Sequence, residues 1–455
     1  MSERFWIETL GCPKNQVDSD KLAGKLLADG MQPAGSPGDA DLVLVNTCAF
    51  IESARQESID VTLGLADARK RGSRLVVTGC MAERYGHELA EALPEADQIV
   101  GFGGAIHTDD DTHTHNDRTP TGKSTAVPVS LGRTRSTTTV PAFDLLNLPR
   151  PKSSAPWAYV KIAEGCDRTC GFCAIPSFRG PQRSRDVSQI VDEVDTLDVQ
   201  EIVLVAQDLA SYGKDRPGEL GAGSIVGLIE AVASRVPRTR LLYLYPSDLT
   251  DALIDVICEH TGVAYFDLSL QHVSKPLLRK MRRWGDGDRF LRRIADIRRR
   301  EPSAAFRSNF IVGYPGETED DHDELLSFIR EARLDWCGFF SYSREEGTYA
   351  YDLPGGVPVN LVRERLAELT ELQDAITAQS RDELIGLEIE VLIDRPGVGR
   401  SFREAPEIDG EVRVPTTLAP GSFHRVRVIG AQGPDLDAVP ATAIATAGGS
   451  VQRVV

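Results

Sequence analysis

Between residue 157 and about residue 380, six short apolar segments alternate with stretches of helical periodicity. The segments read AYVKIAE, EIVLVAQ, RLLYLYP, YFDLSLQ, AFRSNFIVGYP and WCGFFSYS. Strands that alternate with helices form parallel sheets, and eight such units close a barrel of roughly 250 residues. Because six units are too few for that closure, the sequence predicts an incomplete (β/α)6 barrel over residues 152–382. Its functional groups are expected at the carboxyl ends of the strands.

The first hundred residues show a related pattern, in which an apolar strand ends at a cysteine and a helix follows. The strands RFWIETLGC, DLVLVNTC and RLVVTGC end at Cys12, Cys48 and Cys80. This pattern predicts a Rossmann-like parallel α/β domain over residues 3–104. The carboxyl ends of such strands line one crevice, so the three cysteines are expected to converge although 36 and 32 residues separate them.

Two further segments have a different character. Residues 105–151 lose all periodicity and are rich in Thr, Ser, Asp and His, which predicts a linker or a disordered insertion. After a long amphipathic helix, LEIEVLIDR and SFHRVRVIG alternate with period two. We therefore expect a small antiparallel β domain over residues 384–455.

Composition limits the classes of function. The net charge is −17, so the molecule as a whole repels phosphate backbones and suits a cationic partner better than nucleic acid. The basic run 275–300 is an exception, with a solvated helix face favoured over a phosphate-binding face. No segment approaches 18 uninterrupted apolar residues and the N-terminus has no leader pattern, so a cytoplasmic enzyme that does not contact membranes is expected.

The stretch EGCDRTCGFC places Cys166, Cys170 and Cys173 at C-x3-C-x2-C spacing, directly after the first predicted barrel strand. Thiolates at such short spacing suit an iron–sulfur cluster. Structural zinc needs four closed ligands, and the next cysteine, Cys258, is 85 residues further on. Three thiolates leave one iron open to an exogenous ligand, which is useful for catalysis.

This loop, with Phe172 before its last cysteine, resembles the signature of radical S-adenosylmethionine (SAM) enzymes. The resemblance implies a 4Fe-4S cluster whose open iron binds SAM, and a radical that removes hydrogen from an unactivated carbon. NFIVGYPGE resembles the strand that contacts SAM in that family, which makes Gly313 and Glu317 candidate SAM contacts beside Phe172. An ordinary strand followed by a Pro-Gly turn is the alternative.

With Cys12, Cys48 and Cys80 upstream, the whole chain outside the insertion resembles the methylthiotransferases. The resemblance implies a second 4Fe-4S cluster on these three cysteines, a C-terminal TRAM domain, and two SAM molecules used with a sulfur donor. It implies no catalytic residue beyond the six cysteines. Cys258 and Cys337 match no cluster position and are expected in the core. Lys14 and Asn15 either support a cluster or SAM or only begin a helix.

Two branches of the family compete. RimO modifies the β-carbon of an aspartate in small-subunit ribosomal protein S-twelve, whereas MiaB modifies an adenosine of tRNA. The motifs GCPKNQVDSD, EGCDRTCGFCAIPSFRG and YLYP resemble the RimO forms, and MiaB-like sequences usually place Gln, Met and Asn after the first cysteine. From Arg381 to Val455 there are 8 Arg, no Lys and 11 acids, hence 8 − 11 = −3, which suits a cationic ribosomal protein.

The RimO branch implies a monomer that acts on the ribosomal protein, free or in the ribosome, with flavodoxin or ferredoxin as electron donor. MiaB-like activity remains the alternative, and the basic run 275–300 is the feature that favours it. A cluster-bearing electron carrier without catalysis is a hypothesis of another class. The six-unit barrel argues against it, since an electron carrier needs no large SAM cavity.

Overall fold

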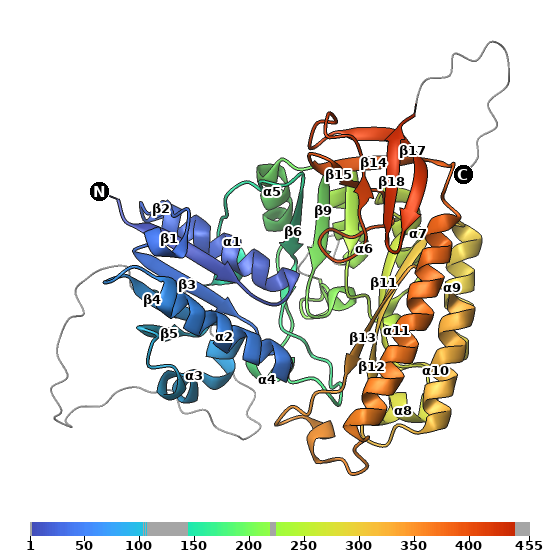
Figure 1. Cartoon of the computed structure of the whole chain (residues 1–455), viewed down its shortest axis with the longest axis horizontal. Helices are drawn as coiled ribbons and strands as arrows, with labels where there is room; N and C mark the ends of the chain where they lie inside the picture. The colour runs from blue at the N-terminus through green and yellow to red at the C-terminus, as the bar shows by residue number, and fades with distance from the viewer. Residues whose placement is uncertain (1, 103, 105, 107–143, 219–223, 442–455) are drawn as a thin grey trace.

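The computed structural model of the chain describes residues 2–102, 104, 106, 144–218 and 224–441. Figure 1 shows an N-terminal α/β part in blue, a central part from green to orange, and a small red β barrel over one end of the central part. Most of the predicted insertion 105–151, including residues 107–143, lies outside the described residues. Within the described residues, no helix is long and apolar enough to cross a membrane.

The N-terminal sheet has five parallel strands in the order β2-β1-β3-β4-β5. The three predicted strands are confirmed, and every residue of the central strand β3 is buried, which explains its unbroken apolar run. Strands β2 and β5 were not predicted, because they are only two and three residues long. The elements are β1 (Arg4–Thr9), α1 (Pro13–Ala28), β2 (Gln32–Pro33), β3 (Leu42–Thr47), α2 (Glu52–Ala68), β4 (Arg74–Gly79), α3 (Cys80–Ala92) and β5 (Gln98–Val100).

The central part has six parallel strands in chain order, as the sequence predicted. Two three-stranded sheets, β6-β9-β10 and β11-β12-β13, are joined by a parallel bridge between Leu244 and Leu268. In the described part of the chain, β6 and β13 have no partner on their outer sides, so the barrel is incomplete. The main strands are β6 (Trp157–Lys161), β9 (Glu201–Val205), β10 (Arg238–Leu241), β11 (Tyr265–Gln271), β12 (Ala305–Val312) and β13 (Trp336–Ser341).

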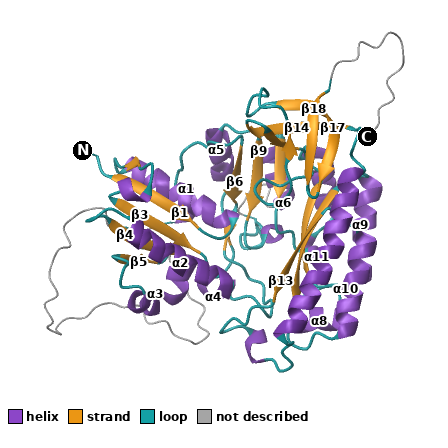
Figure 2. Cartoon of the chain, viewed as in Figure 1, coloured by secondary structure: helices purple, strands orange, loops and turns teal. Residues whose placement is uncertain are grey.

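Helices cover the outer face of these strands, as Figure 2 shows most clearly for α9, α10 and α11. Their apolar sides form the largest hydrophobic core of the molecule. The helices are α4 (Ile175–Arg179), α5 (Val187–Leu197), α6 (Ile225–Ala233), α7 (Asp251–His260), α8 (Lys275–Lys280), α9 (Gly287–Arg300), α10 (Glu319–Ala332) and α11 (Val359–Asp382). A short ribbon of β7 (Ala163–Glu164) and β8 (Arg183–Ser184) spans the loop after β6.

The N-terminal part contacts both free edges of the open barrel. Helix α1 packs beside β6, where Val17 joins the core formed by Tyr159 and its neighbours. On the other side, Glu345 follows β13 and pairs with Arg55 of α2 at 2.6 Å and with Arg84 of α3 at 2.7 Å. The N-terminal part thus lies across the gap between the first and last barrel strands.

The C-terminal part is a closed barrel in the order β14-β15-β16-β18-β17. Most of its pairings are antiparallel, as predicted, but β16 and β18 pair in parallel. A loop of this part reaches the amino ends of the central strands, where Tyr159 donates to the carbonyl of Pro406 (3.0 Å) and Tyr265 donates to Asp409 (2.6 Å). The strands are β14 (Glu388–Arg395), β15 (Val398–Arg400), β16 (Val412–Arg413), β17 (Phe423–Gln432) and β18 (Asp435–Pro440).

Candidate active site

Cys12, Cys48 and Cys80 lie at the carboxyl ends of β1, β3 and β4, and they are near one another. Burial raises the pKa of the Cys48 thiol to about 12, and the electrostatic influence of Cys12 and Cys80 adds to this effect. Gly11 allows the close approach, because a Cβ atom there would lie 3.0 Å from the Sγ of Cys48. The predicted convergence of these three thiols (the first triad) therefore occurs.

Asn15 ties two of these strand ends together. Its side-chain amide donates to the carbonyls of Leu10 (2.8 Å) and Thr47 (3.1 Å), and its Oδ1 lies 3.7 Å from the Sγ of Cys80. Asn15 is fully buried. Its role is thus to position the loops that carry the first triad, in addition to beginning α1.

Cys166, Cys170 and Cys173 (the second triad) share the loop between β7 and α4. The Cys173 amide donates to the Cys170 carbonyl (3.2 Å), and the Cys166 amide donates to the carbonyl of Gly180 (3.0 Å). Two basic residues border the thiols: the Arg168 amide donates to the Sγ of Cys166, and the Arg283 guanidinium donates to the Sγ of Cys170, each at 3.4 Å. A backbone amide of the loop and a guanidinium from outside it therefore contact two of the three sulfurs.

The donor sets suit iron–sulfur clusters better than single ions. Among the described residues, no group of three or more His, Cys, Asp or Glu side chains is arranged to hold one metal ion. A 4Fe-4S cluster binds each thiolate through a different iron, so its three ligands need not meet at one point. Each triad offers three thiols and nearby cations, Lys14 and Arg179 for the first triad and Arg168 and Arg283 for the second, which would offset the negative charge of a bound cluster.

Arg179, which was not among the residues predicted from the sequence, joins the two triads. It ends α4, the short helix that directly follows the second triad. Its Nη2 donates to the Sγ of Cys80 (3.0 Å) and to the Oδ1 of Asn15 (2.9 Å) in the first triad. The available signal was local: SFRG places an arginine six residues after Cys173, but spacing alone does not show what it contacts.

Arg179 is part of a buried network of four charged side chains. Arg179 and Lys161 share the carboxylates of Asp18 and Glu164, and all four side chains are mostly or wholly buried. Burial alone would raise the pKa of Glu164, but Arg179 and Lys161 outweigh it and lower that pKa to about 2. Two cations thus balance two anions at the contact between α1, β6 and α4.

The thiols of the first triad differ in acidity. Burial raises the pKa values of Cys48 and Cys80. Burial also acts against ionisation of Cys12, but Lys14, the amide of Asn15 and Arg179 outweigh it and lower its pKa. Cys12 is therefore the first-triad thiol that most readily becomes a thiolate, the form that binds metal.

Two tyrosines of the YLYP motif face different triads. The ring of Tyr243, which is close enough to Cys12 for an electrostatic effect, lies 3.7 Å from the Nζ of Lys14. Tyr245 lies near the Cys170 thiol and beneath the guanidinium of Arg283, 4.0 Å from its ring centre. The carboxyl end of β10 therefore borders both cysteine triads.

The three candidate SAM contacts have different surroundings. Phe172 is partly buried against the main core. Gly313 follows β12 with φ of +84°, a backbone conformation that favours glycine. Glu317 is buried, accepts the Gly313 and Tyr314 amides and pairs with Arg365 at 2.8 Å. Its carboxylate thus fixes the turn after β12, and contact of these three residues with SAM stays a prediction.

The remaining sequence candidates belong to the scaffold. In the basic run, Arg293 and Arg300 of α9 both pair with Asp251 of α7, and Arg299 pairs with Asp296. A helix face with its own acidic partners fits the favoured solvated interpretation. Cys258 and Cys337 are partly buried against the main core.

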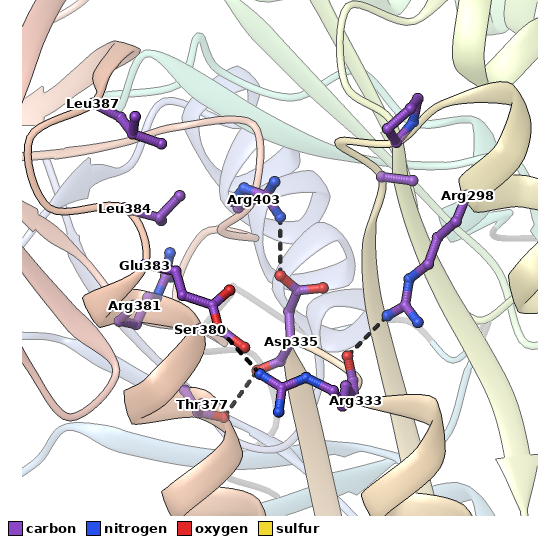
Figure 3. A pocket seen from close by; sticks show the side chains of 12 residues that line it. Arg298, Arg333, Asp335, Thr377, Ser380, Arg381, Glu383, Leu384, Leu387 and Arg403 are labelled. Atoms are coloured by element: carbon purple, nitrogen blue, oxygen red, sulfur yellow. Dashed lines mark hydrogen bonds and ion pairs between the residues drawn. The ribbon is translucent and has the colours of Figure 1, made fainter.

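A pocket of about 360 Å³ lies at the opposite end of the central barrel, beside the residues that precede β12 and β13. Figure 3 shows its arginines directed at partners within the protein. Arg403 donates to Asp335 (3.0 Å), and Arg298 donates to the carbonyl of Arg333 (2.8 Å). Arg403 thus helps attach the C-terminal barrel, whereas Arg298 joins α9 to the segment before β13, and the pocket is far from both triads in the fold.

Family models match each of the three parts of the chain. Residues 4–101 match the Uncharacterized protein family UPF0004, residues 160–329 the Radical SAM superfamily and residues 385–440 the TRAM domain. Among solved structures, the radical S-adenosylmethionine methyltransferase TsrM from Kitasatospora setae aligns with a TM-score of 0.47 and 14% identity, covering 92% of this chain and 83% of that one.

Curated relatives match over nearly the whole length. The ribosomal protein uS12 methylthiotransferase RimO of Nocardioides sp. is 40% identical, with 95% of this chain and 96% of that protein covered. The protein of the same name from Streptomyces avermitilis is 41% identical with 95% of each covered, and that from Moorella thermoacetica is 40% identical with 93% and 96% covered. This chain therefore belongs to the RimO family of ribosomal protein uS12 methylthiotransferases.

Proposed function

We propose that the chain is a radical SAM methylthiotransferase that adds a methylthio group to the β-carbon of an aspartate in ribosomal protein uS12. The observation that carries the proposal is the 40% identity over about 95% of both chains to relatives with that name. The two cysteine triads, which Arg179 connects, support it, because the reaction needs one site that generates a radical and another that supplies sulfur.

In this proposal, Cys166, Cys170 and Cys173 hold one 4Fe-4S cluster and Cys12, Cys48 and Cys80 hold a second. Phe172, Gly313 and Glu317 contact SAM, and Glu317 also positions the turn that carries Gly313. When bound, the clusters and SAM supply the reducing electron, the hydrogen-abstracting radical and the methylthio sulfur.

The residues of the chain itself position these groups. Arg179 connects the second-triad segment to Cys80, so the two loops cannot move independently without breaking a buried ion network. The N-terminal part covers the open side of the barrel through α1 and through the contacts of Glu345. Both features favour a water-poor space between the triads, where a radical is protected from side reactions.

The biological setting completes the proposal. The enzyme acts in the cytoplasm as a monomer, receives electrons from flavodoxin or ferredoxin, and modifies uS12 free or in the ribosome. Its domains are the methylthiotransferase N-terminal domain (3–104), the insertion (105–151), the radical SAM barrel (152–382) and the TRAM domain (384–455).

The test is anaerobic reconstitution of the full chain, followed by mass spectrometry of purified uS12 and of tRNA after incubation with SAM, reductant and a sulfide source. We expect a methylthio mass gain on uS12 and about eight irons per chain. A triple alanine variant at Cys12, Cys48 and Cys80 is the matched control. It should retain about four irons and 5′-deoxyadenosine formation, and lose methylthio transfer. A mass gain on tRNA alone would reject the assignment in favour of MiaB-like activity.

A further inference from the structure

Lys14 lies where the two parts of the protein meet, between the first triad and the end of β10. It is in the first turn of α1, two residues after Cys12. Its Nζ lies 3.7 Å from the ring centre of Tyr243, and its charge lowers the pKa of Cys12. The ammonium group is therefore next to a thiol of the first triad and to a side chain of the radical SAM barrel.

Lys14 has no carboxylate partner in the part of the chain that the structure describes, unlike most cations around it. Lys161 and Arg179 pair with Asp18 and Glu164. Elsewhere at the strand ends, Arg307 pairs with Asp267 and Asp409, and Arg168 pairs with Asp208 and Asp248. Arg283 also has no carboxylate partner among the described residues, but it donates to the Sγ of Cys170 and to the carbonyl of Ser269.

The tyrosine whose ring lies beneath Lys14 has a strained backbone. Tyr243 has φ of +66°, which is unfavourable for an aromatic residue. Asp267 accepts the Tyr243 amide at 3.0 Å and helps keep this conformation. Strained backbone of this kind concentrates at functional sites. A half-buried cation without a counter-ion is also unfavourable, and a ring face compensates only part of its lost hydration.

We infer that Lys14 binds the side-chain carboxylate of the substrate aspartate, an inference that rests on the proposed function. An ammonium ion and a carboxylate form a charge-assisted hydrogen bond. In aspartate the reacting β-carbon is bonded directly to the carboxyl carbon. A lysine that binds the carboxylate beside Cys12 therefore fixes the β-carbon close to the triad that supplies sulfur. The substrate anion also provides the counter-charge that Lys14 lacks.

The test compares the full-length reconstituted enzyme with its Lys14→Met and Lys14→Arg variants. Methionine keeps an apolar stem of similar length without the charge, and arginine keeps the charge. Lys25→Met is the matched control, since Lys25 is on the same helix but pairs with Asp29 at an exposed position. Two measurements are made: KM and kcat for methylthio transfer to uS12, and the dissociation constants of uS12 and of uS12 whose target aspartate is replaced by asparagine.

Wild-type enzyme should bind the aspartate form at least about tenfold more tightly than the asparagine form, as expected for a charged hydrogen bond. Lys14→Met should lose this discrimination and raise KM by about tenfold or more, while the iron content is retained. Lys14→Arg should retain part of the discrimination, and Lys25→Met should retain all of it.

Two results would overturn the inference. One is a Lys14→Met enzyme that still discriminates aspartate from asparagine as wild type does. The other is a loss of iron or an altered cluster spectrum with unchanged discrimination, which would assign Lys14 to the cluster. If wild-type enzyme does not modify uS12 at all, the proposed function fails instead, and that outcome is distinct from both.

Discussion

Replacement of Glu201 by Gln should loosen the attachment of the C-terminal barrel to the central barrel. Glu201 begins β9 and is completely buried. Its carboxylate pairs with Arg240 of β10 at 2.7 Å and with Arg400 of β15 at 2.9 Å. One carboxylate therefore joins two arginines from different parts of the molecule. Replacement by Gln would leave both buried guanidinium groups without the negative charge of Glu201.

The size of the expected loss of stability follows from the pKa of Glu201. Burial would raise the pKa of Glu201, but Arg240, Arg400 and Arg238 outweigh it and lower the pKa from 4.5 to about 2. Because one pKa unit corresponds to about 1.4 kcal/mol, the charge stabilises the folded state by about 3 kcal/mol. This agrees with the cost of about 3–5 kcal/mol for removing one partner of a buried pair. The contribution is present above about pH 4.5 and is lost as the pH falls toward 2.

Scanning calorimetry of the full chain at pH 7.5 measures the effect. A loss of about 3 kcal/mol should lower the transition that includes the two barrels by about 5–10 °C. Glu411→Gln is the matched control, since Glu411 pairs with Arg395 at an exposed position and should cost less than about 1 kcal/mol. If Glu201→Gln melts within about 2 °C of this control, the charge of Glu201 does not hold the barrels together.

Two further predictions concern the loops of the site. Gly165→Ala should lower both thermal stability and the iron content of the second triad, because φ is +80° and the added methyl group would overlap the Pro181 carbonyl. Gly180→Ala, at φ of +73° with open space, should cost only about 1–2 kcal/mol; equal melting temperatures and iron contents would contradict the overlap argument. His272, buried near Asp321, His322 and Arg365, has its pKa lowered by burial to about 4. Since its unfolded pKa is about 6.5, stability should fall by about 1.4 kcal/mol per pH unit below pH 6.5. His272→Asn should flatten the dependence of melting temperature between pH 7 and 5.5, and an unchanged slope would refute the assignment.

Features set by neighbouring residues could be predicted from the sequence. The strands of both α/β parts coincide with the apolar runs. A short run of β-branched residues favours a strand, and a parallel strand is buried on both faces. The second triad is a property of one loop, so its spacing alone is enough to predict its chemistry. The first triad required one more step, since its three thiols meet only because parallel strands end at the same edge of a sheet.

The sequence alone determined the parallel strands, the spacing of the second triad and the family, because each depends on periodicity or motifs within short stretches. Only the tertiary structure decided how the triads are joined. Arg179 reaches Cys80 across 99 positions of the chain, and Glu317 is paired by Arg365, which is 48 residues away. Lys14 meets Tyr243 because α1 packs against the open edge of the barrel. Such contacts form only when segments that are far apart in the sequence pack together. The local sequence around one residue therefore does not show which residue it will contact.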